Sequence, residues 1–218
     1  MASTRASSVY DRLHKDILTG ELRPGERLRL KDLIDSYQTG NSPLREALNR
    51  LSSNGLVVRE ENRGFSVPAV SLGELEELTR TRSWVEERAL RESIANGDEA
   101  WEEKLVLAFH WLQQAYDKRK TGEFDDTRWA EYHNGFHIAL IAACGSDLLI
   151  DFCNQLQART YRYRNLAEVV AYRHEHEQDE HAAIYNATLE RSTEKAVELL
   201  KAHYWATFEV LRDSGHFS

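Results

Sequence analysis

Apolar residues recur every three or four positions along most of this chain, which is the spacing of one face of an α-helix. After residue 70 the pattern predicts six long helices, at about 72–96, 99–120, 126–144, 146–167, 171–190 and 193–213. No proline follows Pro68, and no alternating, strand-like pattern competes with the helical one. Residues 70–218 are therefore expected to form an all-helical bundle of six or seven helices.

The first 69 residues follow a different pattern, made of short elements. It predicts a helix near 9–18, a second helix at 31–37, a tight turn at 38–40, a third helix from residue 42, and two short strands around a turn at 61–64. Two helices joined by a turn and followed by a two-stranded wing make a winged helix-turn-helix domain. The expected fold is thus mainly α, with this domain over residues 1–69.

The boundary between the two predicted domains lies near Pro68. A proline disfavours helix at the preceding Val67 and does not continue a central strand. Ser71 and Glu74, three residues apart, then form the pattern of a capping box, which is typical of a helix start. A new domain is therefore expected to begin here.

The start of the third helix, in the run Asn41–Leu48, indicates a function. Ser42 suits a helix N-cap, and Pro43 suits the first helical position. The apolar residues that follow share one face: Leu44, Ala47, Leu48 and Leu51. Arg45 lies on the opposite, polar face. A helix with this arrangement can enter the major groove of DNA by its N-terminal end.

Two interpretations of this domain remain open, a generic small helical subdomain and a DNA-binding one. Arginines on both reading elements, Arg45 in the helix and Arg63 in the wing turn, favour DNA. We expect Asn41 and Arg45 to read bases, Lys31 and Ser42 to contact phosphates or bases, and Arg63 with Gly64 to place the wing in or along the minor groove. The expected partner is a double-stranded DNA operator with a short inverted repeat, bound by a homodimer.

The net charge of −8 is unevenly distributed. Residues 1–70 hold 11 Lys+Arg and 9 Asp+Glu, a net charge of +2, so the remaining residues carry −10. Non-specific DNA affinity should therefore be modest, because it depends on total positive charge. Specific binding would depend on the local placement of charge and on dimerisation.

The compartment is indicated by what the sequence does not contain. It shows no signal peptide and no apolar run of membrane-spanning length, so we expect a cytoplasmic protein without a membrane partner. The two cysteines, Cys144 and Cys153, lie in apolar helical sequence at a spacing that matches no zinc-ligand pattern. Both are expected to be reduced core residues.

Four histidines of the predicted bundle fall on or beside inward faces. His133 and His137 are four residues apart and share a helical face, while His181 and His203 lie on two later helices. Neutral imidazole is a common ligand of divalent transition metals. The alternative is that each is an ordinary hydrogen-bonded core histidine, and the spacing alone does not separate the two.

The N-terminal motifs resemble a known family. The runs Gly20–Leu28, Ser42–Leu48, Gly55–Val57 and Arg63–Val67 are similar to the winged-helix domain of GntR-type transcription regulators. The resemblance extends from about Val9 to Val67. One departure is Asn41, where the family often has arginine, and this change favours adenine over guanine edges at that position.

Residues 72–213 resemble the all-helical ligand-binding domain of the FadR subfamily, called the FCD domain. The matching motifs are Phe136-His137, Glu180-His181 and Ala202-His203. The resemblance implies a metal held by an Asp and three histidines, for which His137, His181 and His203 match. His133 stands where the family has the Asp, so the site has one negative charge fewer. A divalent transition metal is expected, with zinc or nickel favoured but its identity open.

Three arginines are candidates for holding an effector: Arg82, Arg159 and Arg162. Arg82 and Arg159 lie on predicted core-facing sides of their helices, where a charge needs a partner. A small carboxylate effector, which the resemblance also implies, would supply one. An internal salt bridge such as Arg82 to Glu86 explains Arg82 equally well. The stretch 129–152 is similar to regulators of carbon-starvation and glutarate-type catabolism.

Together these observations predict a ligand-responsive transcription regulator that is not an enzyme. We expect a repressor of a carboxylate catabolic operon that its effector releases from DNA. The alternatives are a metal-dependent enzyme that uses the histidine cluster, and a DNA-binding protein whose bundle only dimerises. The operator, the regulated genes, the effector and the direction of its effect stay open at this point.

Overall fold

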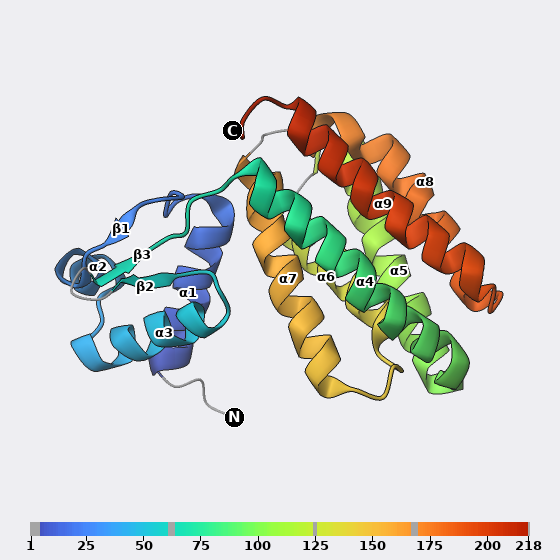
Figure 1. The fold of residues 1–218 in the computed structure, drawn as a ribbon, viewed down its shortest axis with the longest axis horizontal. Coiled ribbons are helices and arrows are strands. Elements are labelled where there is room, and N and C mark those ends of the chain that lie inside the picture. The colour runs from blue at the N-terminus through green and yellow to red at the C-terminus, as the bar shows by residue number, and fades with distance from the viewer. Residues whose placement is uncertain (1–4, 61–63, 124–125, 167–169, 218) are drawn as a thin grey trace.

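The computed structural model describes residues 5–60, 64–123, 126–166 and 170–217, which form a winged half and a helical half (Figure 1). The winged half contains α1 (Arg5–Thr19), β1 (Arg27–Leu28), α2 (Leu30–Tyr37), α3 (Asn41–Ser53), β2 (Val58–Glu60) and β3 (Gly64–Ser66). The helical half contains α4 (Leu72–Asn96), α5 (Glu99–Lys120), α6 (Asp126–Ile141), α7 (Asp147–Leu166), α8 (Val170–Leu189) and α9 (Thr193–Asp213). The predicted fold class is confirmed.

The winged half is built on one apolar core that α1, α2, α3 and the sheet enclose. The predicted inward face of α3 is confirmed, since Leu44, Ala47, Leu48 and Leu51 are all buried. The sheet has three strands in the order β1-β3-β2, with β3 antiparallel to both neighbours, so the predicted two-stranded wing was incomplete. With only two residues, Arg27 and Leu28, β1 is too short to show an alternating pattern in the sequence.

The start of α3 differs from the prediction. Gly40, in an extended conformation, precedes the first helical residue Asn41, so Ser42 is not the N-cap. Pro43 is then the third helical residue, where its missing N–H costs no hydrogen bond because the first turn has no acceptors for its N–H groups. Ser42 and Asn41 therefore both lie in the exposed first turn of the helix.

The linker to the bundle ends at a capped helix. Ser71 Oγ accepts a hydrogen bond from the Glu74 backbone N–H at 3.2 Å, as the capping pattern predicted. The Glu74 carboxylate does not complete the capping box with the Ser71 backbone. It accepts hydrogen bonds from Arg159 and from the Tyr163 hydroxyl instead, and so ties the start of α4 to α7.

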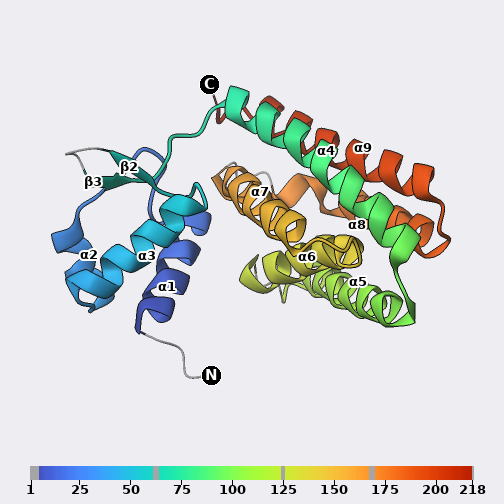
Figure 2. The ribbon, with the colours of Figure 1, turned by 60° about the horizontal axis from the view of Figure 1, so that its bottom comes forward.

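The helical half is a six-helix bundle over the described residues, in which α4 packs on α9 and α7, α5 on α6, and α8 on α9 (Figure 2). Its main core is aromatic and aliphatic, and it includes Trp101, Tyr116, Phe136 and Tyr204. The two cysteines are buried free thiols. None of the helices in the described ranges has an apolar stretch sufficient to cross a bilayer.

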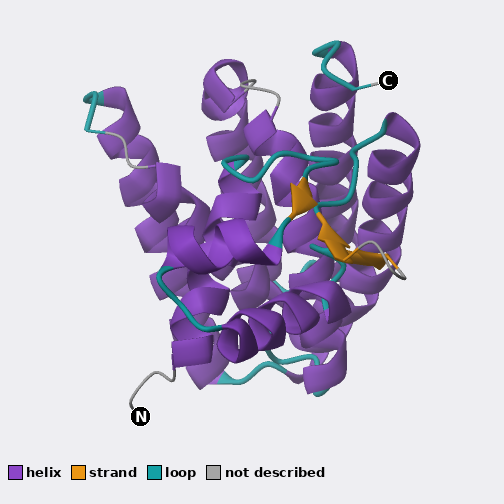
Figure 3. Cartoon of the chain, turned by 90° about the vertical axis from the view of Figure 1, so that its left-hand side faces the viewer, coloured by secondary structure: helices purple, strands orange, loops and turns teal. Residues whose placement is uncertain are grey.

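The two halves meet where α1 packs against α7. Viewed from the winged side, the strands and short helices of the winged half lie in front of the long helices of the bundle (Figure 3). The Asn165 side chain donates a hydrogen bond to the backbone carbonyl of Leu18, at 2.6 Å. Ala158, also on α7, packs against the core of the winged half. The winged half is thus joined to the bundle by a helix–helix contact as well as by the linker.

Candidate metal centre and adjoining cavity

The bundle brings the four predicted histidines together from three helices. His133 and His137 come from α6, His181 from α8 and His203 from α9. All four are buried, and one ring nitrogen of each lies within 4.8 Å of those of the others. Periodicity had placed each on or beside an inward face, and the packing of three helices around one point makes them a cluster.

Three of the rings are held on their outer nitrogen. The Nδ1 atom of His181 lies 3.0 Å from the Tyr116 hydroxyl, that of His137 lies 3.3 Å from the Tyr204 hydroxyl, and that of His203 lies 2.7 Å from Glu180 Oε2. Each contact leaves Nε2 to face the cluster, and Nε2 of His137 is 3.2 Å from Nε2 of His181. Partners of this kind orient histidine rings and set their tautomer in metal sites.

His133 has a different environment. Its ring stacks on Trp129 with the centroids 4.7 Å apart, and its Nε2 lies 3.4 Å from Arg164 Nη1. Arg164 also donates to Glu177 Oε1 at 2.6 Å, and this oxygen is 3.8 Å from His133 Nε2. Burial opposes the ionisation of Glu177, but the charge and hydrogen bond of Arg164 together with His181 and His203 outweigh it and lower the pKa of this carboxyl to about 2. A buried negative charge therefore lies beside the position where the family has its Asp.

The electrostatics favour neutral imidazoles. Burial lowers the pKa of His133, His137 and His181 well below the ordinary value, and the neighbouring rings and Arg164 lower it further. Neutral rings present free lone pairs, which is the form that binds a metal. Four converging nitrogen donors, three of them with held outer nitrogens, fit a divalent transition ion.

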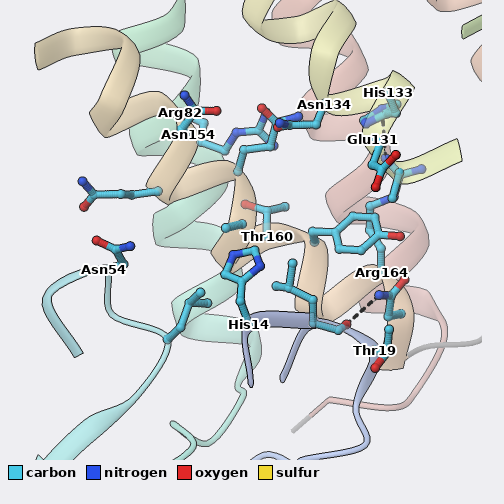
Figure 4. Close-up of a pocket in the computed structure, with 18 of the residues that line it drawn as sticks. His14, Thr19, Asn54, Arg82, Glu131, His133, Asn134, Asn154, Thr160 and Arg164 are labelled. Carbon is cyan, nitrogen blue, oxygen red and sulfur yellow. Dashed lines mark hydrogen bonds between the residues drawn. The ribbon is translucent and has the colours of Figure 1, made fainter. Parts of the chain in front are cut away.

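A cavity of about 980 Å³ adjoins the cluster (Figure 4). Arg82 lines it, and its Nε donates to Glu86 Oε1 at 2.8 Å, so the internal salt bridge considered from the sequence is formed. The Nη2 atom of Arg82 is buried and has no hydrogen-bond partner among the described residues. The side-chain amide of Gln157, another lining residue, likewise has no partner there for its nitrogen or its oxygen.

The other two predicted arginines lie elsewhere. Arg159 pairs with Glu74 at 2.7 Å, and Arg162 is 1% exposed, with no hydrogen-bond partner for its guanidinium among the described residues; neither lines the cavity. The α7 arginine that does line it is Arg164. Gln157, Thr160 and Arg164 face the cavity from α7, on a different side of the helix from the apolar stripe that the sequence indicated.

The predicted DNA-contacting residues of α3 are together on one surface. Asn41, Ser42 and Arg45 are exposed and flank a shallow groove with Asn49 and Arg50. Exposed positions are also found for Lys31 in α2 and for Gly64, which starts β3 with a positive φ of 90°. Arg63 lies outside the described residues.

Comparison with known proteins gives a family match for each half of the chain. Residues 5–67 match the family model described as bacterial regulatory proteins, gntR family, and residues 77–206 match the FCD domain. The chain belongs to the GntR family, with an FCD domain. It is a ligand-responsive, DNA-binding transcription regulator.

Two curated proteins are similar in sequence to this GntR-family regulator over most of its length. The uncharacterized HTH-type transcriptional regulator BphR of Paraburkholderia xenovorans strain LB400 is 34% identical over 209 residues, 95% of this chain and 85% of that protein. The HTH-type transcriptional repressor GlaR of Escherichia coli strain K12 is 30% identical, over 94% of each chain. Among solved structures, E. coli McbR/YncC shares the fold, with a TM-score of 0.79 at 24% identity over 98% of this chain and 99% of that one.

Proposed function

We propose that this regulator is a homodimeric repressor that a small carboxylate releases from operator DNA by binding in the cavity beside the histidines. One observation carries the proposal. Arg82 lines a cavity that also reaches His133 and His203, and its buried Nη2 has no hydrogen-bond partner among the described residues. A buried cationic donor needs an acceptor, and a carboxylate oxygen supplies one with charge assistance.

Four side chains would hold the metal: His133, His137, His181 and His203. Zinc or nickel suits this all-imidazole donor set best. When bound, the ion supplies a Lewis-acidic position for a carboxylate oxygen. On the protein side, Arg82 and Arg164 would neutralise the acid, and Gln157 would hydrogen-bond it.

The metal-dependent enzyme is the weaker alternative. An enzyme of this kind needs a general base that is free to take a proton from water beside the metal. The carboxylates nearest the cluster already have partners, since Glu180 holds His203 and Glu177 holds Arg164.

The name of GlaR states that this relative is a repressor, which supports repression, and not activation, as the effect of the present chain on transcription.

On DNA, we propose that Asn41 and Arg45 read bases from the major groove while Lys31 and Ser42 contact the backbone. The wing turn with Arg63 and Gly64 would lie in or along the minor groove of an inverted repeat. The support is the exposed polar surface at the start of α3. Because its work is on DNA, we place the protein in the cytoplasm.

For the dimer, we propose that a second copy covers the outer faces of the adjacent helices α4 and α7. Large apolar side chains are exposed there: Trp84 is 61% exposed, Leu148 84% and Phe152 43%. Exposed apolar groups of this size are typical of contact surfaces. Sedimentation of a Trp84→Glu, Leu148→Glu variant should show monomers, and an unchanged dimer would exclude this surface.

The test of the effector site is a titration of short mono- and dicarboxylates against a preformed operator complex. Wild-type protein should release DNA, and Arg82→Ala should need at least about tenfold more acid, because it loses a charge-assisted hydrogen bond. Arg159→Ala is the matched control, since Arg159 pairs with Glu74 outside the cavity. The proposal is wrong if no acid changes DNA affinity, or if Arg82→Ala responds like wild type.

A further inference from the structure

The outer wall of the cavity is made by the DNA-binding half. Tyr10, His14 and Leu18 of α1 line the same cavity as Arg82 and His203. The close-up shows His14 rising from α1 toward Thr160 of α7 (Figure 4). A ligand in this cavity is therefore enclosed by both halves of the molecule, with Arg82 toward the top of the view and His14 of α1 toward the bottom (Figure 4).

The cavity is large for a short acid. Pockets of about 300–1,000 Å³ suit ligands of drug size, and this cavity has about 980 Å³. An acid held at Arg82 would leave the part against α1 to water or to a longer ligand body. Gln157 lies on the α7 wall with a side chain only 6% exposed and an unpartnered amide, so the wall offers a donor and an acceptor to whatever fills this space.

The α1 wall is also in contact with the DNA-reading helix. The ring of Tyr10 stacks on His14, with centroids 5.7 Å apart and planes inclined by 22°. Tyr10 makes two further contacts. Its hydroxyl accepts a hydrogen bond from the Asn54 side chain at 3.1 Å, and the Arg50 guanidinium lies 4.2 Å from the centroid of its ring. Arg50 belongs to α3 and Asn54 caps its C-terminal end. A ligand that touches His14 and Tyr10 thus touches side chains packed on α3.

We propose that the α1 wall is a second subsite, which takes the distal end of an elongated acid with an apolar body and a terminal hydrogen-bonding group. The carboxylate of this acid lies at Arg82, and its far end lies against His14 and Tyr10. The inference rests on the proposed effector site and names its ligand class. The effector then acts on the orientation of α3 through α1 directly, in addition to any movement of the linker.

The test is a length series of straight-chain dicarboxylates, from three to about ten carbons, measured by calorimetry. In wild type, affinity should rise about fourfold for each buried CH₂ until the chain reaches α1. His14→Ala should weaken the long acids about tenfold and leave the short ones unchanged, because only long acids reach this side chain. Arg82→Ala should weaken every acid. His110→Ala, at an exposed histidine of α5, is the matched control.

The outcomes separate this inference from the proposed function. If short acids bind in an Arg82-dependent way but length and His14→Ala have no effect, the α1 subsite is wrong and the effector site stands. If no acid binds wild type, both are wrong. His14→Gln keeps a polar side chain of similar reach, so it should retain more long-acid affinity than His14→Ala. Equal losses for short and long acids in both variants would show that His14 supports the cavity as a whole and not the far end of the acid, and would overturn the subsite.

A second readout follows the contact with α3. Tyr10→Phe removes the hydroxyl that Asn54 contacts but keeps the ring against His14. At saturating concentrations of a long acid, the operator affinity of this variant should fall by a smaller factor than that of wild type, whatever change the substitution makes in the affinity for the acid itself. The same reduction as in wild type would mean that the signal does not pass through this hydrogen bond, and would contradict the proposed route.

Discussion

The hydroxyl of Tyr116 is the group whose removal tests the histidine cluster with the least disturbance to the fold. Its hydroxyl meets Nδ1 of His181, while its ring stays packed against Trp129 in the core. Tyr116→Phe should therefore leave the fold intact and weaken metal binding about tenfold, the lower end of what lost orienting partners cost. Competition against a chelator of known affinity measures this.

The matched control is Tyr185→Phe, at a half-buried tyrosine that stacks on Phe109 at 4.1 Å. It removes the same atom from the same type of ring, so its metal affinity should equal that of wild type. Equal affinity in both variants would show that the hydroxyl of Tyr116 does not orient His181.

The buried imidazoles also predict a pH dependence of stability. Burial holds the pKa values of His133, His137 and His181 below the ordinary 6.5, so in acid the unfolded chain binds more protons than the folded chain does. The free energy of unfolding of chelator-treated protein should fall as the pH drops below about 6.5, by about 1.4 kcal/mol per pH unit for each such proton. Urea denaturation at pH 7, 6 and 5 measures it, and a flat profile would contradict the assigned burial.

At the scale of elements, α3 carries the DNA prediction. Arg45 lies in its second turn and is exposed, and the apolar face of the helix is buried in the winged core. Arg45→Ala should weaken operator binding by roughly 1–3 kcal/mol per half-site and relax base preference at one position. Fluorescence anisotropy on operator and mismatched duplexes measures both.

Arg59→Ala, at an exposed arginine of β2 away from the start of α3, serves as the comparison. As a loss of general positive charge it should weaken all duplexes alike and change the salt dependence without changing base preference. An Arg45→Ala variant that behaves in the same way would mean that Arg45 contacts phosphate and not bases.

Periodicity predicted the helices and their buried faces because one repeat fixes both. It found Leu44 and Leu48 in the winged core, and it found the inward positions of His137 and His181. It did not find Arg164, whose importance comes from the direction of one stripe of α7 toward α6 and α8. Nor did it indicate Glu177 as a charge near His133, since the two residues lie on different helices, and a repeat within one helix does not show which residues of another helix it contacts.

At the scale of the whole molecule, the contact between α1 and α7 decides how the two halves communicate. The bundle carries most of the negative charge and the histidine cluster, the exposed α3 surface lies in the other half, and both halves line the cavity. Because Leu18 both lines the cavity and accepts the Asn165 hydrogen bond through its carbonyl, a ligand that moves this segment also moves the domain contact. The binding of an acid in the cavity and of operator DNA should therefore be coupled, with a measurable coupling free energy.

The most direct test of this coupling is to measure the affinity of one releasing acid for the protein, with and without saturating operator. Thermodynamic linkage demands that operator weaken acid binding by the same factor by which acid weakens operator binding, typically about 5–150-fold in coupled systems. We predict equal factors in metal-loaded protein, and a factor close to one after the metal is removed. An acid affinity that operator leaves unchanged in the metal-loaded protein would contradict the proposed coupling between the cavity and the DNA-binding surface.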